Sequence, residues 1–140
     1  MINEIIDGIS EAIYEDFGDG YNIYTEEVEQ GLEKPCFSIV CVKPTSNLYR
    51  GRRHQIVNLF CIYYFSSTSD TTAESMAVVD RLYDCLEYIK VDGDLTRGTN
   101  MRAEVAELNT WAFFVEYDMF VIKTEEIDNM EELELEEEIY

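Results

Sequence analysis

The chain has 140 residues, of which 30 are acidic and 10 are basic, so its formal net charge at pH 7 is −20. A protein that binds phosphate backbones or anionic lipids needs clustered Lys and Arg, so this charge argues against DNA, RNA and membranes as primary partners. Hydrophobic residues make up 46% of the chain, which is enough to build the core of one folded domain.

The first half of the chain predicts one helix followed by three strands. Apolar residues recur at helical spacing through residues 1–17, and the run Gly18-Asp19-Gly20 supplies the helix stop. The strands are expected at residues 21–27, 36–43 and 54–65, with a turn at residues 44–51. The strand at 54–65 is apolar on both faces, which is typical of a central strand or of a second buried surface.

The second half predicts one helix and a hairpin. Asp70 or Thr71 caps the helix, and Thr71 with Glu74 fits a capping box. The core-facing stripe of this helix is expected to contain Ala73, Met76, Val79, Leu82, Tyr83, Leu86 and Ile89. After a turn at Asp92-Gly93-Asp94, strands at 97–108 and 111–123 form a hairpin around Asn109-Thr110.

These elements predict an α+β fold, in the order α-β-β-β-α-β-β. We expect a mostly antiparallel sheet of four to five strands with two helices packed on one face. Two helices cannot cover both faces of such a sheet, although its long strands are apolar on both. The uncovered apolar surface therefore predicts an interface with another protein.

The chain is expected to divide into a single domain, residues 1–124, and an acidic C-terminal segment, residues 125–140. Nine of the sixteen residues of this segment are acidic. Two interpretations stay open: a solvated, flexible tail, or an arm that orders against a neighbouring subunit. The apolar residues through which such an arm would make contact are Ile127, Met130, Leu133, Leu135 and Ile139.

No catalytic, metal or cofactor motif is visible. The four cysteines, Cys36, Cys41, Cys61 and Cys85, lack CxxC spacing and lie among apolar residues, so we expect reduced core thiols. The single histidine has no second ligand or nucleophile nearby, so we expect no enzyme activity, no metal and no cofactor. The sequence shows neither a secretion signal nor an apolar run of membrane-spanning length, so a soluble protein is expected.

One basic cluster interrupts the acidic chain. Arg50, Arg52 and Arg53, with His54 beside them, lie at the predicted turn between two strands. They are interpreted either as a charged turn that keeps the hairpin soluble or as a contact with an acidic neighbour or the tube of an assembly.

Three stretches resemble one protein family: YTEEVEQGLEKPCF at 24–37, LYDCLEYIKVDGDLTRGTNM at 82–101 and FFVEYDMFVIK at 113–123. The opening MINEIIDGISEAIYEDFGDGY and the acidic run MEELELEEE at 130–138 fit as well. Together they are similar to the phage tail terminator proteins of Gram-positive phages and prophages.

The resemblance implies a structural subunit. Such a protein forms a ring, typically of six copies, on the last ring of the tail tube, stops tube polymerisation and prepares the tail for joining to the head. The implied partners are further copies of itself, the tail tube protein and the head–tail connector protein. The implied location is the host bacterial cytoplasm during assembly and then the virion tail. The alternative interpretation is an acidic protein-binding module or an inhibitor that mimics nucleic acid.

Overall fold

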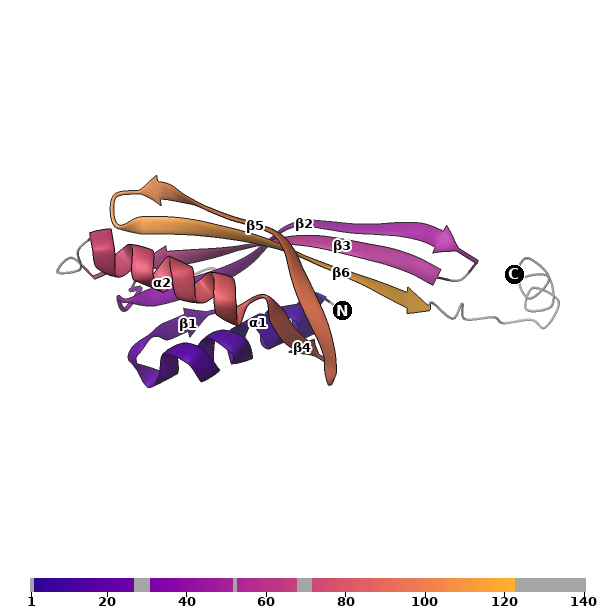
Figure 1. Cartoon of the computed structure of the whole chain (residues 1–140), viewed down its shortest axis with the longest axis horizontal. Coiled ribbons are helices and arrows are strands. Elements are labelled where there is room, and N and C mark those ends of the chain that lie inside the picture. Colours follow the sequence, from indigo (N-terminus) through magenta and orange to yellow (C-terminus); the bar gives the residue numbers. More distant parts are fainter. Residues whose placement is uncertain (1, 27–30, 52, 68–71, 123–140) are drawn as a thin grey trace.

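The computed structural model describes residues 2–26, 31–51, 53–67 and 72–122, and for residues 45–50, 53, 54 and 120–122 only the backbone is described. The described elements are helices α1 (Ile2–Phe17) and α2 (Thr72–Cys85), a 3₁₀ turn (Gly18–Gly20) and strands β1 (Asn22–Tyr24), β2 (Cys36–Arg50), β3 (Arg53–Phe65), β4 (Tyr88–Val91), β5 (Asp94–Glu107) and β6 (Thr110–Ile122). The predicted α+β class is confirmed, with both helices on the same side of a curled sheet (Figure 1).

The six strands of the described ranges form one sheet in the order β1-β2-β3-β6-β5-β4. β1 pairs parallel with β2, where Ile23 lies opposite Phe37, and the other pairs are antiparallel. The sheet is therefore mixed and has more strands than the four to five that the sequence predicts.

The prediction of a turn at residues 44–51 is wrong. β2 continues through this polar stretch to Arg50, and the hairpin reverses at Gly51, whose φ of 58° suits glycine. Pro44 lies inside the strand opposite Asn58. A proline that cannot donate a ladder hydrogen bond is tolerated there because no described strand flanks this part of β2 on its outer side.

The predicted second helix extends too far. α2 ends at Cys85, and Ile89 belongs instead to β4, where it is buried together with Val91. Ala73 and Met76, which were expected on the core-facing stripe, are exposed, whereas Ser75, Val78, Val79 and Leu82 are buried. The cap candidates Asp70 and Thr71 lie outside the described residues.

Strand β5 is shared between two parts of the sheet. Its first residues, from Asp94 to Arg97, pair with β4, and from Gly98 onward it pairs with β6. The strand bends at this change of partner, and a β-carbon on Gly98 would lie 2.6 Å from the Leu86 carbonyl oxygen. The bend carries β4 onto α1, as Figure 1 shows, and Gly8 of α1 packs directly against the backbone of Lys90.

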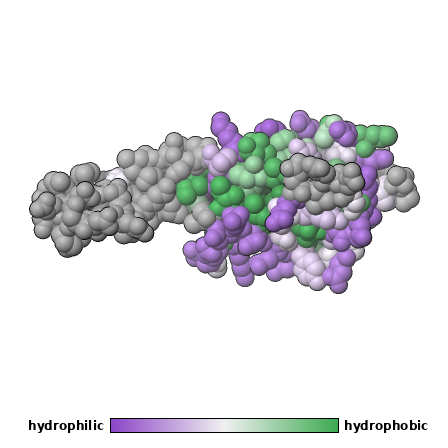
Figure 2. Space-filling model, turned by 180° about the vertical axis from the view of Figure 1, so that it is seen from behind, coloured by the Kyte–Doolittle hydropathy of each residue, from purple (hydrophilic) through white to green (hydrophobic). Residues whose placement is uncertain are grey.

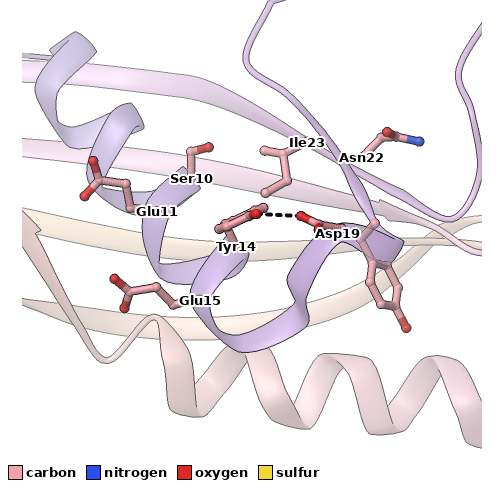
Figure 3. Close-up of a pocket in the computed structure, with 8 residues that line it drawn as sticks. Ser10, Glu11, Tyr14, Glu15, Asp19, Asn22 and Ile23 are labelled. Carbon is pink, nitrogen blue, oxygen red and sulfur yellow. Dashed lines mark hydrogen bonds between the residues drawn. The ribbon is translucent and has the colours of Figure 1, made fainter.

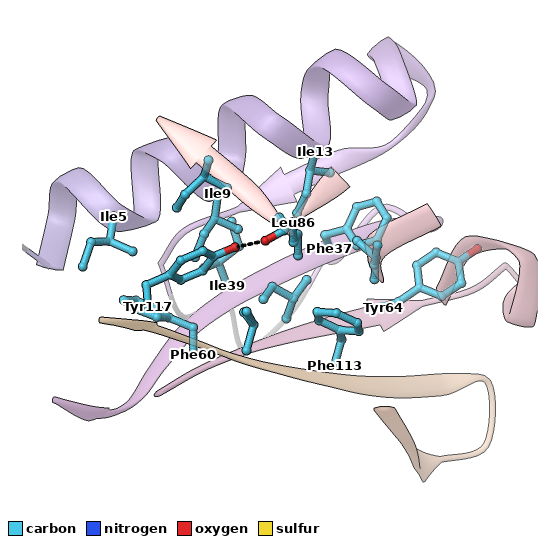
Figure 4. Close-up of a cluster of buried hydrophobic side chains, with 14 of the residues drawn as sticks. Ile5, Ile9, Ile13, Phe37, Ile39, Phe60, Tyr64, Leu86, Phe113 and Tyr117 are labelled. Atoms are coloured by element: carbon cyan, nitrogen blue, oxygen red, sulfur yellow. Dashed lines mark hydrogen bonds between the residues drawn. The ribbon is translucent and has the colours of Figure 1, made fainter. Parts of the chain in front are cut away.

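The core lies between the helices and one face of the sheet. Ile5, Ile9 and Ile13 project from α1 toward the aromatic side chains of the central strands (Figure 4). The buried Tyr117 hydroxyl donates a hydrogen bond to the Leu86 carbonyl, with an O–O distance of 2.7 Å. This bond joins the centre of β6 to the residue that follows α2, so it fixes the helical layer on the sheet.

Candidate interaction surfaces

The face of the sheet that carries no described helix is rich in apolar side chains. Alternation along β2, β3 and β6 places Val40, Cys61 and Phe114 side by side on it, since each lies opposite the next in the strand register. Val40 is 42% exposed, whereas Cys61 is covered by its neighbours. Seen from behind, the molecule shows hydrophobic surface across its middle with hydrophilic surface around it (Figure 2).

A charged residue covers part of this face. The guanidinium of Arg102 on β5 lies over the ring of Phe114, 4.4 Å from its centroid, in the geometry of a cation–π contact. Tyr63 and Phe65 lie nearby on β3 with ring centroids 6.2 Å apart. This helix-free face is the uncovered apolar surface that the sequence predicts, and large aromatic side chains of this kind are typical of protein interfaces.

Besides the terminal strands β1 and β4, long parts of β2 and β5 have an edge that no other described strand covers. β1 pairs only with residues Cys36 to Ser38, so the outer side of β2 is uncovered from Ile39 onward. The Gly98 N–H still donates to the Glu87 carbonyl just before β4, so the outer side of β5 is uncovered by a described strand from Thr99 to Glu107. An edge strand presents backbone N–H and C=O groups with which another chain can pair.

A hollow of about 520 Å³ lies at the uncovered edge of β2. Its lining is mostly apolar and comprises Ile6, Thr25, Leu32, Ser38, Ile39, Val40, Cys41, Tyr63 and Phe65. Ile39 faces the core, whereas Val40 and Tyr63 belong to the helix-free face. Residues from both faces line one hollow because the hollow runs around the edge of the strand.

A second hollow, of about 480 Å³, lies beside α1 and is lined by side chains that carry polar groups together with Ile23. The Tyr14 hydroxyl donates a hydrogen bond to Asp19 Oδ1 across it, at 2.5 Å (Figure 3). This hydrogen bond to a carboxylate raises the pKa of Tyr14. Glu11, Glu15 and Asp19 line the hollow, and no His, Cys, Lys or Arg does.

A family model described as phage tail terminator protein matches residues 4–129. The chain belongs to this family. The match begins in α1 and extends beyond the end of β6, so it spans every element of the fold. Among curated proteins, none matches the chain. As a member of the family, this terminator is a component of the phage tail and interacts with other tail or head proteins.

Three of the predicted contact residues of this terminator, Arg50, Arg53 and His54, lie at one end of the sheet. Arg50 ends β2, Arg53 and His54 begin β3, and the backbone register pairs Arg50 with Arg53. Arg52 lies outside the described residues, as do the predicted arm contacts Ile127, Met130, Leu133, Leu135 and Ile139. The backbone therefore brings Arg50, Arg53 and His54 together at the tip of a hairpin, and their contacts with a neighbour remain a prediction.

One charge signal in the terminator sequence was missed. Residues 34–69, which include β2 and β3, contain five basic residues and no Asp or Glu. The basic residues are Lys34, Lys43, Arg50, Arg52 and Arg53. All 30 acidic residues therefore lie outside this stretch, with the other five basic residues. Counting charges in windows along the chain would have identified the segregation.

The four thiols of this terminator are free. Burial raises the pKa of the Cys61 thiol to about 11 and that of the Cys85 thiol to about 12. Such thiols stay protonated and poorly nucleophilic at neutral pH. Within the described ranges no group of three or more His, Cys, Asp or Glu side chains is placed to hold a metal ion. Neither described helix is long and apolar enough to cross a lipid bilayer.

Proposed function

We propose that the protein assembles as a ring, typically of six copies, on the last ring of a phage tail tube. There it stops polymerisation of the tube and prepares the tail for joining to the head. The observation that carries this proposal is the family match, which covers the whole fold between residues 4 and 129. The partners in this function are the tail tube protein, the head–tail connector protein and further copies of the chain.

The surfaces of the sheet support this function. A closed ring needs a heterologous contact, in which one patch of each subunit meets a different patch of the next. The two uncovered edges lie on opposite sides of the sheet, one on β2 and one on β5. The helix-free face supplies further apolar area for contact with a neighbour or with the tube.

The function is structural and has no catalytic step. The family match supports this proposal, and the Cys61 and Cys85 thiols are protonated at neutral pH. Assembly takes place in the cytoplasm of the host bacterium, and the finished ring is part of the virion tail. The Arg50, Arg52 and Arg53 cluster then contacts an acidic surface of a neighbouring subunit or of the tube.

Negative-stain microscopy of the protein mixed with its tube protein tests this function. Short tubes that carry a ring at one end are the expected result, and tubes of unlimited length would contradict termination. The double variant Arg52→Glu with Arg53→Glu is expected to weaken oligomerisation, measured as a lower mass by light scattering. A matched control reverses two exposed charges elsewhere, Lys90→Glu with Arg97→Glu, and is expected to keep the mass. Equal masses for both variants would remove the role of the cluster.

A further inference from the structure

We propose that the uncovered edge of β2 accepts the acidic C-terminal segment, residues 125–140, of a neighbouring copy, which adds to the sheet as an extra strand. This inference rests on the proposed ring, for which it names the contact between subunits. The acceptor is the stretch from Ile39 to Cys41 together with the apolar hollow beside it.

The edge is open to strand addition only over a short stretch, because the ladder with β3 has a bulge between Cys41 and Lys43 and Pro44 follows it. β1 occupies the outer side of β2 only as far as Ser38, so an added strand would take the next place along the same edge. Val40 and Val42 are 42% and 49% exposed there. β-branched side chains with open backbone groups beside them suit an incoming extended chain, whose main-chain hydrogen bonds supply affinity. The hollow that runs around this edge gives alternate side chains of the added strand a place to bury.

Charge identifies the occupant. The acceptor lies within residues 34–69, which carry five basic residues and no acidic one, and exposed Lys34 and Lys43 flank it. Residues 125–140 carry nine acidic residues and no basic one. Glu26 and Glu33 lie on the connection between β1 and β2, next to the hollow residues Thr25 and Leu32. β2 itself offers the segment Lys43 and no acidic side chain, so the attraction comes from that strand.

The pattern of the segment fits a strand. Leu133 and Leu135 alternate with Glu132, Glu134 and Glu136. In an extended chain successive side chains point to opposite sides, so both leucines would face the hollow while the glutamates face solvent and the flanking lysines. A helix would separate these two leucines by about 200° and would lose this match.

Reach allows either a neighbouring copy or the same chain. β6 ends at Ile122 opposite Arg53, and the near end of the acceptor, Cys41, lies opposite Phe60. Seven residues of strand and two strand spacings separate these points by about 25 Å in a straight line. The eleven residues from Ile122 to Leu133 span about 36 Å at most when fully extended. The choice of a neighbouring copy therefore rests on the proposed ring, and mixing two isotopes tests it.

Photo-cross-linking of the full-length chain tests the contact. A photo-reactive p-benzoylphenylalanine replaces Val42, and unlabelled and ¹⁵N-labelled copies are mixed and irradiated with and without tube protein. The expected product joins position 42 of one isotope to residues 125–140 of the other. The matched control places the same group at Leu95, which is 67% exposed on β5, and is expected to give no such product.

Leu133→Glu with Leu135→Glu is expected to lower the yield of the Val42-position cross-link about tenfold, since two apolar side chains no longer bury. Cross-links confined to one isotope would show that each chain covers its own edge and would overturn the proposal. Absence of any product with residues 125–140 would overturn it as well. Both readouts are independent of tube length, so terminated tubes without this cross-link would refute the acceptor site and leave the proposed function intact.

Discussion

The hydrogen bond between Tyr117 and Leu86 is expected to stabilise the fold measurably. Tyr117 is fully buried, and its hydroxyl lies 2.7 Å from the Leu86 carbonyl oxygen. Burial also raises the pKa of this hydroxyl, so it remains a donor throughout the neutral range. Tyr117→Phe keeps the ring but removes the donor, which leaves a buried carbonyl without this partner at a cost of about 1–3 kcal/mol.

The cost converts into a shift of melting temperature. A domain of this size loses about 3–4 °C of Tm for each kcal/mol, so Tyr117→Phe is expected to lower Tm by about 3–12 °C. Circular dichroism on heating measures the shift, and urea unfolding measures the free energy.

A second tyrosine supplies the control. Tyr14 is 53% exposed and donates to Asp19 at the surface, so Tyr14→Phe makes the same chemical change where water can replace the bond. Its expected cost is below about 0.5 kcal/mol. Equal losses in the two variants, or an unchanged Tm for Tyr117→Phe, would refute the assignment of stability to the buried bond.

Two further predictions concern buried groups. Asn58 is fully buried on β3, and neither polar atom of its side chain has a hydrogen-bond partner in the structure. Asn58→Leu is therefore expected to raise the free energy of unfolding by about 1–3 kcal/mol. A lower Tm for this variant would show that the amide of Asn58 is satisfied. The raised pKa values of Cys61, about 11, and Cys85, about 12, mean that the unfolded thiols ionise first, near their usual value of 9. Their contribution to the free energy of unfolding is therefore complete below pH 9 and is lost as pH rises toward 12. Urea titrations at pH 8 and 10 measure this loss. The double variant Cys61→Ala with Cys85→Ala should lose less free energy of unfolding between these two pH values.

Strong local periodicity made much of the fold predictable. α1 has apolar residues at helical spacing and a glycine stop, and the β5–β6 hairpin turns where the sequence predicts, at Asn109. β4 was missed because Ile89 falls at helical spacing from Leu82 and Leu86, so a four-residue strand continued the pattern of the helix before it. Only tertiary packing against α1 decides between a longer α2 and a separate strand β4.

The candidate surfaces were predictable in part. Two-sided apolarity in β3 indicated an uncovered face, and that face is present. The edge of β2 was not predictable, because it depends on where β1 stops and on the continuation of β2 through Pro44. Local sequence preferences favour a turn at Pro44, and pairing with β3 overrides them.

The division of β5 between two partners has a consequence for how the chain folds. Gly8 packs against Lys90, and β3 forms its ladder with β6, more than forty residues later. Residues of α1 thus reach one of their final neighbours only after β4 has been synthesised, about eighty residues later. Contacts between such distant parts slow folding. We therefore expect the core to form after translation, and α1 to reach its final packing only when the β4–β5 hairpin covers it.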